Sequence, residues 1–176
     1  MSEARPLPEF VRVTRGRRVA LVHPDFAPQV ADALLDSTGV RPANLQGRGE
    51  MLSVDTPRGE VLIRKYLRGG MVARVLRDAY LFDNRPLKEL QIHQHAWRSG
   101  VPTVTPVGAM WEQSGVVYRG AYATLRVPAE DLLAHLGKSD GASPVLASCG
   151  RAIRAMHRAG IYHADLQVKN ILVSRG

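Results

Sequence analysis

The stretch from His163 to Asn170 reads His-Ala-Asp-Leu-Gln-Val-Lys-Asn and is the most informative part of the chain. A helical pattern precedes it and ends at Gly160, and a short apolar run at 171–173 follows it. The sequence therefore predicts a polar loop between a helix and a strand. This loop carries a carboxylate at Asp165 and an amide at Asn170, five residues apart.

The spacing of this loop matches the His-Arg-Asp-Leu-x-x-x-Asn catalytic loop of protein kinases. In that loop the Asp faces the acceptor hydroxyl, and the Asn holds a magnesium ion bound to the nucleotide phosphates. We therefore assign Asp165 as the base or hydroxyl-orienting group and Asn170 as a metal ligand. One alternative is a polar turn without a catalytic role. Another is a metal site of His157, His163 and Asp165, whose spacing fits no standard zinc arrangement.

Three further features precede this loop in the order that a kinase requires. Gly47 and Gly49 flank Arg48 just before a strand, where they form either a phosphate cradle or an ordinary turn. The next strand contains Arg64 and Lys65, and alternation allows only one of them to face a nucleotide. Arg64 is favoured by direct matching to the kinase lysine.

Glu89 lies on the next predicted helix, where a kinase supplies the carboxylate that pairs with this cation. The alternative for Glu89 is an ordinary surface glutamate, and the alternative for both cations is an exposed strand position. The agreement in order is stronger than any single feature.

Apolar patterning and turn residues predict the secondary structure of the rest of the chain. Gly39 is expected to close the first helix. The expected strands are 10–13, 18–22, 51–54, 60–66, 104–111 and 116–124, and the expected helices are 28–35, 84–100, 129–136 and 143–160.

Composition limits the classes of partner. The chain has 176 residues, and its 24 Lys and Arg against 16 Asp and Glu give a formal net charge of +8, which favours anionic partners. Nucleic acid is not expected, because aromatic residues are only 6% and no groove-reading motif is present. The single cysteine excludes an internal disulfide, and no apolar run approaches the length of a bilayer span.

The chain resembles the lipopolysaccharide-core sugar kinases, and within them the 3-deoxy-D-manno-octulosonic acid (Kdo) kinases of Gram-negative bacteria. The resemblance extends from about Gly47 to Val173. It is carried by Gly47-Arg48-Gly49, R-K-Y-L-R-G-G at 64–70, D-A-Y-L-F at 78–82, R-P-L-K-E-L at 85–90, G-V-P-T-V-T-P-V at 100–107 and M-H-R-A-G-I-Y-H-A-D-L-Q-V-K-N-I-L-V at 156–173.

The resemblance implies an α+β, protein-kinase-like fold of two lobes, with the C-terminal lobe truncated after the catalytic loop. Residues 1–124 would form a β-rich N-terminal lobe with one main helix, and residues 125–176 a partial helical lobe. It also implies ATP and Mg²⁺ as cofactors, with transfer of the γ-phosphoryl group to the 4-hydroxyl of a Kdo residue on lipid A.

The expected partners are Kdo-lipid A, or a related lipopolysaccharide precursor, and the anionic cytoplasmic face of the inner membrane. Arg68, Arg74 and Arg77 are candidates for that contact. A heptose kinase of the same core remains an alternative. The sequence stops before the Asp-Phe-Gly segment of kinases. An inactive nucleotide- or lipid-binding module, or a fragment of a longer enzyme, is therefore also considered.

Overall fold

The computed structural model describes residues 10–43, 51–68, 84–114, 117–138 and 143–174. It divides into two compact units. Of the described residues, the larger unit contains those between 10 and 94 and between 104 and 126, and the smaller unit contains those at 95–103 and between 127 and 174. The predicted lobe boundary at residue 124 stays a prediction, because compactness alone does not establish independent domains.

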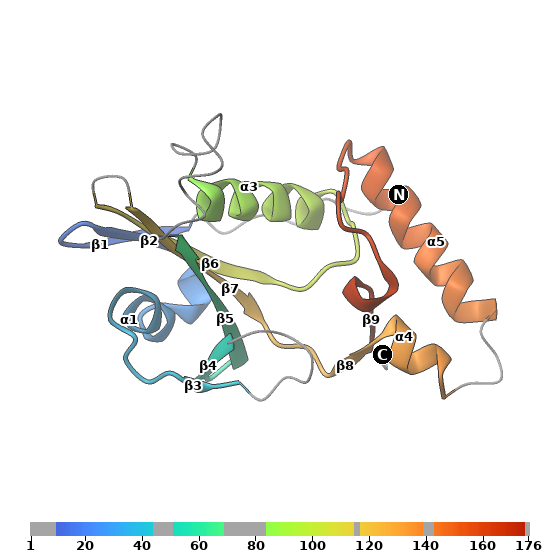
Figure 1. The fold of residues 1–176 in the computed structure, drawn as a ribbon, viewed down its shortest axis with the longest axis horizontal. Helices are drawn as coiled ribbons and strands as arrows, with labels where there is room; N and C mark the ends of the chain where they lie inside the picture. The colour runs from blue at the N-terminus through green and yellow to red at the C-terminus, as the bar shows by residue number, and fades with distance from the viewer. Residues whose placement is uncertain (1–9, 44–50, 69–83, 115–116, 139–142, 175–176) are drawn as a thin grey trace. The chain divides into compact units, whose positions relative to one another are not determined.

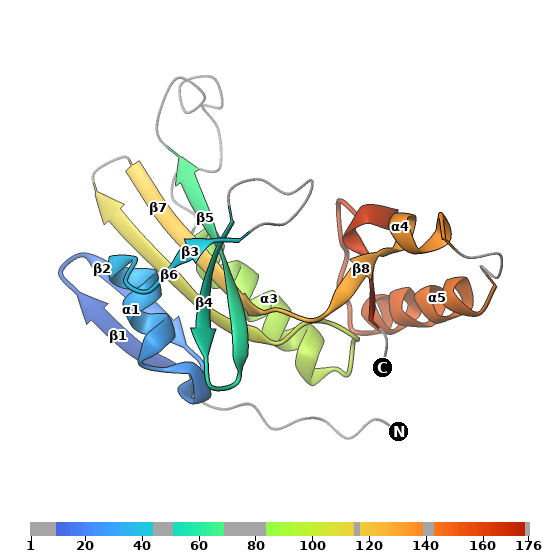
Figure 2. The same cartoon turned by 90° about the horizontal axis from the view of Figure 1, so that it is seen from below.

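A seven-stranded antiparallel sheet forms the larger unit, in the order β1-β2-β6-β7-β5-β4-β3 (Figures 1 and 2). β5 and β7 are therefore neighbours, although about fifty residues of sequence separate them. The strands are β1 (Val11–Arg15), β2 (Arg18–Val22), β3 (Arg41–Pro42), β4 (Met51–Thr56), β5 (Gly59–Arg68), β6 (Pro106–Ser114) and β7 (Val117–Leu125).

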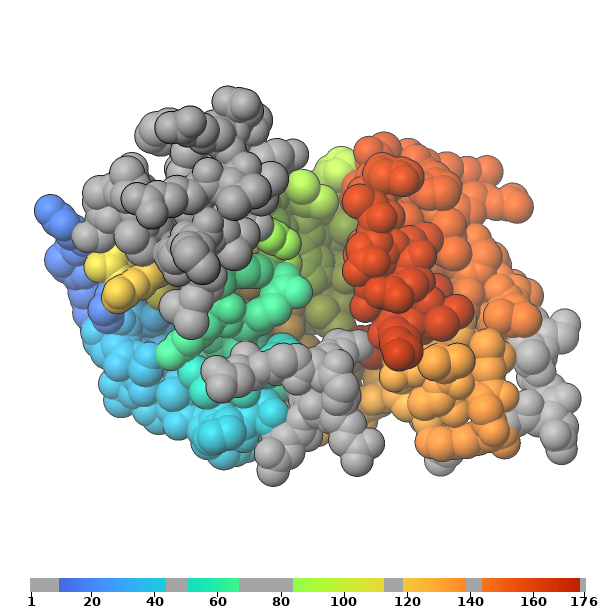
Figure 3. Space-filling model, viewed as in Figure 1, coloured from blue at the N-terminus to red at the C-terminus, as the bar shows by residue number. Residues whose placement is uncertain are grey.

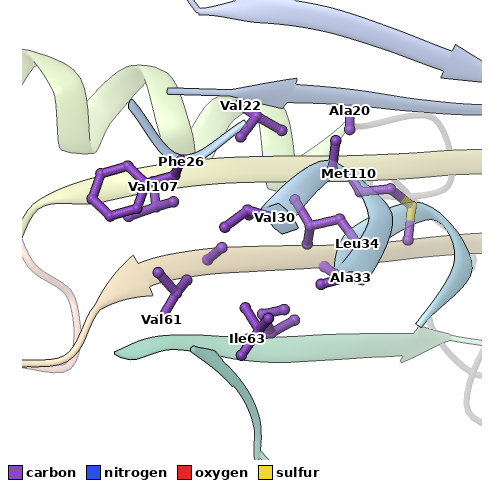
Figure 4. Packing of buried hydrophobic residues seen from close by; sticks show 14 of the residues in the cluster. Ala20, Val22, Phe26, Val30, Ala33, Leu34, Val61, Ile63, Val107 and Met110 are labelled. Carbon is purple, nitrogen blue, oxygen red and sulfur yellow. The ribbon is translucent and has the colours of Figure 1, made fainter. Parts of the chain in front are cut away.

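One face of this sheet packs against α1 (Gln29–Asp36). Most of the α1 side chains are apolar and buried, which is why so short a helix is held firmly against the sheet. Val61 and Ile63 of β5 face the same core, as the two-residue period of a strand requires. Figure 4 shows this cluster from close by.

The opposite face carries α3 (Arg85–Arg98), where Leu90 packs with Ala109 and Tyr122. Figure 1 shows α1 and α3 on the two sides of the sheet. The helix begins as its sequence predicts, because the Asn84 side chain accepts a hydrogen bond from the Leu87 amide at 3.2 Å. It ends at Gly100, whose φ of +72° suits the glycine there.

The smaller unit contains a two-stranded sheet and two helices. Strand β8 pairs antiparallel with β9, and a 3₁₀ turn precedes β9. The elements are β8 (Ala129–Asp131), α4 (Leu132–Leu136), α5 (Ser143–Arg158), the turn Val168–Asn170 and β9 (Leu172–Ser174).

Two details of the predicted secondary structure are wrong. Residues 129–131 form β8 and not the first turn of a helix, because they pair with β9. The helix begins only at Leu132, where Asp131 accepts a hydrogen bond from the Ala134 amide at 2.8 Å. α1 ends at Ser37, which itself adopts a φ of +59°, and not at Gly39.

Gly120 provides a test of how β7 meets α3. A Cβ atom at Gly120 would overlap the ring of Pro86 in the first turn of α3 and lie 3.2 Å from the Met110 carbonyl oxygen. We expect Gly120→Ala to lower the free energy of unfolding by about 1–3 kcal/mol, because the backbone must move apart. Urea unfolding followed by circular dichroism measures this change.

The matched control is Gly150→Ala, since Gly150 lies inside α5 with nothing within 4 Å of its Cβ position. This substitution should stabilise by roughly 1 kcal/mol through helix propensity. Equal effects of the two substitutions would contradict the packing of Pro86 on β7.

Candidate functional site

Alternation along β5 separates the two candidate cations. Arg64 points to the α3 face and Lys65 to the α1 face, because successive strand side chains lie on opposite faces. The Arg64 guanidinium pairs with the Glu89 carboxylate of α3 at 2.5 Å. The Lys65 ammonium lies 3.1 Å from the Ser37 hydroxyl at the end of α1. Arg64 is therefore the cation that meets Glu89.

Tyr66 joins this ion pair, and sequence reasoning missed it. Its hydroxyl accepts a hydrogen bond from Arg64 Nε at 3.1 Å and donates one to the Glu89 carboxylate. Burial and the neighbouring Glu89 carboxylate raise the pKa of Tyr66 to about 12, so the phenol stays protonated and remains a donor at neutral pH. The available signal was its position two residues after Arg64, on the same face of the strand.

A second guanidinium adds positive charge to this cluster of Arg64, Tyr66 and Glu89. The Arg85 guanidinium carbon lies 5.2 Å from the centre of the Tyr66 ring, within cation–π range. The Arg64 side chain is 49% exposed, so it still reaches solvent while it pairs with Glu89. Among the described residues of this cluster, two guanidinium groups lie against one carboxylate, and such a surplus of positive charge suits phosphate oxygens.

His93 braces α3 against the sheet behind this cluster. One ring nitrogen lies 2.9 Å from the Val104 carbonyl oxygen and the other 2.6 Å from the Tyr122 hydroxyl. A carbonyl only accepts, so Nε2 carries the proton and Nδ1 accepts from the phenol. Burial lowers the pKa of His93, which keeps the ring neutral in this arrangement.

The 163–170 loop belongs to the smaller unit and orders its polar side chains around Asp165. The Asn170 amide nitrogen donates to the Asp165 backbone oxygen at 2.8 Å and to its carboxylate at 3.1 Å. Gln167 also donates to this carboxylate, at 3.2 Å. Asp165 and Asn170 are exposed, and Figure 3 shows this red end of the chain at the surface.

Regular structure fixes both ends of the loop. α5 closes at Gly160, whose φ is +72°, and the Ile161 amide bonds back to the Met156 carbonyl oxygen at 3.1 Å. After the loop, the Leu132 amide donates to the Ile171 carbonyl oxygen at 2.9 Å, and β9 pairs with β8. The loop is therefore held at a helix end and at a strand start.

Asn170 fits the chemistry of a magnesium ligand. Its amide nitrogen is used in holding Asp165, so its carbonyl oxygen is left for a hard cation, which prefers oxygen ligands. Within the described ranges, no three His, Cys, Asp or Glu side chains gather into a metal site. The alternative site of His157, His163 and Asp165 thus has no geometric support.

Other predicted contacts lie outside the described residues. They are Gly47, Gly49, Arg74 and Arg77, together with the side chain of Arg68. No helix in the described part of the chain has the length and apolar character needed to cross a bilayer.

Comparison with known proteins gives a family match. The model of the family described as "Lipopolysaccharide kinase (Kdo/WaaP) family" matches residues 36–176. A 3-deoxy-D-manno-octulosonic acid kinase of Xanthomonas euvesicatoria pv. vesicatoria is 36% identical over 140 residues, which cover 77% of this chain and 56% of the relative.

A second relative, from Stenotrophomonas maltophilia, is a 3-deoxy-D-manno-octulosonic acid kinase with 33% identity over 136 residues. These cover 75% of this chain and 55% of the relative. The chain thus spans about half the length of the curated relatives that it matches.

The partly buried His93 predicts a pH dependence of stability. Its pKa is lowered from an ordinary value of 6.5, so the unfolded chain binds a proton at a higher pH than the folded one. Stability is therefore full above pH 6.5 and falls as the pH drops below it, until the folded imidazole also protonates. Unfolding free energies measured by urea titration across this range should show the decline.

His93→Gln should flatten this decline, and the control His157→Gln removes an exposed histidine of α5 instead. His23, whose pKa burial also lowers, contributes in the same direction, so a residual slope is expected. An unchanged slope in His93→Gln would contradict a neutral, partly buried His93.

Proposed function

Since the chain belongs to the lipopolysaccharide kinase (Kdo/WaaP) family, we propose that it takes part in transfer of the γ-phosphoryl group of ATP to a sugar hydroxyl of a lipopolysaccharide precursor. The proposed acceptor is the 4-hydroxyl of Kdo on lipid A. The observation that carries this proposal is the exposed Asp165 carboxylate, oriented by Asn170 within the 163–170 loop.

Asp165 acts on the acceptor in this proposal. Its carboxylate hydrogen-bonds the sugar hydroxyl and accepts its proton while the hydroxyl oxygen forms a bond to the γ-phosphorus. The bond from that phosphorus to the bridging oxygen breaks, and ADP leaves. The hydrogen bonds from Asn170 and Gln167 hold the carboxylate in a fixed orientation.

Asn170 is the proposed ligand of Mg²⁺. When bound, the ion offsets the negative charge of the nucleotide phosphates. The chain's own contribution is to aim the amide oxygen, through the hydrogen bonds that the amide nitrogen makes to Asp165.

Arg64 is the proposed contact to the ATP phosphates. Glu89 and Tyr66 fix the direction of its guanidinium, and the free part of its fork can meet phosphate oxygens. Gly47 and Gly49 remain the proposed backbone cradle, and Lys65 is the competing cation. Its contact with Ser37 favours a structural role for Lys65.

Charge supports an anionic acceptor at a membrane surface. The net charge of +8 attracts the carboxylate of Kdo, the phosphates of lipid A and the anionic leaflet alike. We propose peripheral association with the cytoplasmic face of the inner membrane. A heptose of the lipopolysaccharide core remains the second candidate acceptor, because the same transfer machinery serves both sugars.

The test of the proposed function is transfer of labelled phosphate from ATP to Kdo-lipid A, with a heptosylated core as the comparison acceptor. Product analysis by NMR locates the new phosphate. Asp165→Ala should reduce transfer roughly 100- to 10,000-fold by removing the base. Its control, Asp36→Ala, removes an exposed carboxylate of α1 and should leave transfer unchanged.

Transfer to the heptosylated core alone would select the heptose kinase. Binding of ATP without transfer to either acceptor would contradict catalysis and favour the nucleotide-binding module.

ATP affinity distinguishes Arg64 from Lys65. Loss of a charge-assisted hydrogen bond to phosphate costs about 1.5–3 kcal/mol, so Arg64→Ala should weaken ATP binding at least tenfold. Lys65→Ala, its neighbour on the opposite face, should change it less than threefold. Calorimetric titration with ATP and Mg²⁺ measures both constants, and a reversed order would assign the phosphate contact to Lys65.

A further inference from the structure

A groove beside α5 contains three arginines that the proposed reaction does not use. Its volume is about 560 Å³, and it lies within the smaller unit. It is lined by Ser99, Arg151, Arg154, Ala155, Arg158 and Ala159, which we call the arginine groove. Because positions i, i+3 and i+7 share one face of a helix, the three guanidinium groups line a single side.

Two helix ends shape this groove. α3 and α5 each end at a glycine with a φ of +72°, Gly100 and Gly160. The His95 ring lies 2.8 Å from the Ala159 carbonyl oxygen and links the last turns of the two helices. Ser99, just after α3, lines the groove together with the arginines and with Ala155 and Ala159 of the α5 end.

The groove arginines differ from those of the larger unit in their ion pairing. In the larger unit, carboxylates pair with Arg15, Arg18, Arg41, Arg58, Arg64 and Arg126. For Arg151, Arg154 and Arg158, none of the carboxylates in the described residues forms such a pair. α5 itself contains no acidic residue.

Three like charges on one helix face repel one another unless an anion lies among them. Guanidinium groups bind phosphate oxygens through two parallel hydrogen bonds, and a serine hydroxyl supplies a further donor. We propose that the arginine groove binds a phosphate group, carried either by an anionic phospholipid or by a soluble phosphate compound. This site is separate from the proposed transfer chemistry, so its test needs no turnover.

The first measurement compares the two sources of phosphate. Co-sedimentation with vesicles of phosphatidylglycerol and phosphatidylcholine in equal parts tests the lipid, and vesicles of phosphatidylcholine alone are the neutral reference. Calorimetric titration with inorganic phosphate tests the soluble source. Vesicle binding that needs phosphatidylglycerol identifies a lipid, and binding of inorganic phosphate alone identifies a soluble compound. Binding of neither overturns the proposal.

The second measurement asks whether the groove is responsible. Arg154→Gln/Arg158→Gln should weaken binding about 25-fold, at roughly fivefold for each arginine lost from an anionic surface. The control Arg12→Gln/Arg119→Gln removes the same charge from exposed positions on β1 and β7. Equal losses in both variants would mean that overall charge attracts the ligand, which overturns the proposal.

A third variant guards against loss of folding, which circular dichroism monitors. Arg154→Lys/Arg158→Lys keeps the charge and the helix propensity but lacks the planar fork. It should retain attraction to anionic vesicles and lose about fivefold in affinity for inorganic phosphate, if that ligand binds. A folded lysine variant with wild-type affinity for inorganic phosphate would overturn the bidentate contact.

Discussion

The ion pair between Arg64 and Glu89 is the interaction on which the larger unit's proposed chemistry depends. It joins β5 to α3, and Tyr66 completes it by contacting both partners. A cation fixed in this way loses little conformational freedom when it meets a phosphate. Packing of Leu90 and the hydrogen bonds of His93 hold α3 at the sheet, so apolar burial supports the polar contact.

Charge is distributed differently in the two units. Carboxylates neutralise many arginines around the seven-stranded sheet, whereas the described arginines of α5 have no such partners. The three arginines of α5 therefore form a local cluster of positive charge that can meet an anion. Phosphate is the common chemistry of both proposals, as the γ-phosphoryl group in one and a bound phosphate in the other.

Prediction from sequence succeeded for features set by neighbouring residues. It failed where pairing between distant segments determined the secondary structure. The start of α3 at Asn84 and its end at Gly100 could be predicted, because the residues that cap a helix lie within a few positions of its ends. The strand at 129–131 could not be predicted, since its partner β9 lies about forty residues later in the sequence. Tyr66 was missed because alternation gives its face but not the neighbours that the face meets.

The sequence by itself determined the helix-loop-strand around Asp165 and Asn170 and the placement of the cations at 64 and 65 on opposite faces of one strand. Spacing and alternation are properties of the local backbone, so they can be read without the fold. Only the tertiary structure decided that Arg64 meets Glu89 while Lys65 meets Ser37, and that Ser99 joins the arginines of α5. These choices depend on which helix covers each face of the sheet and on how helix ends dock, and both arise from long-range packing.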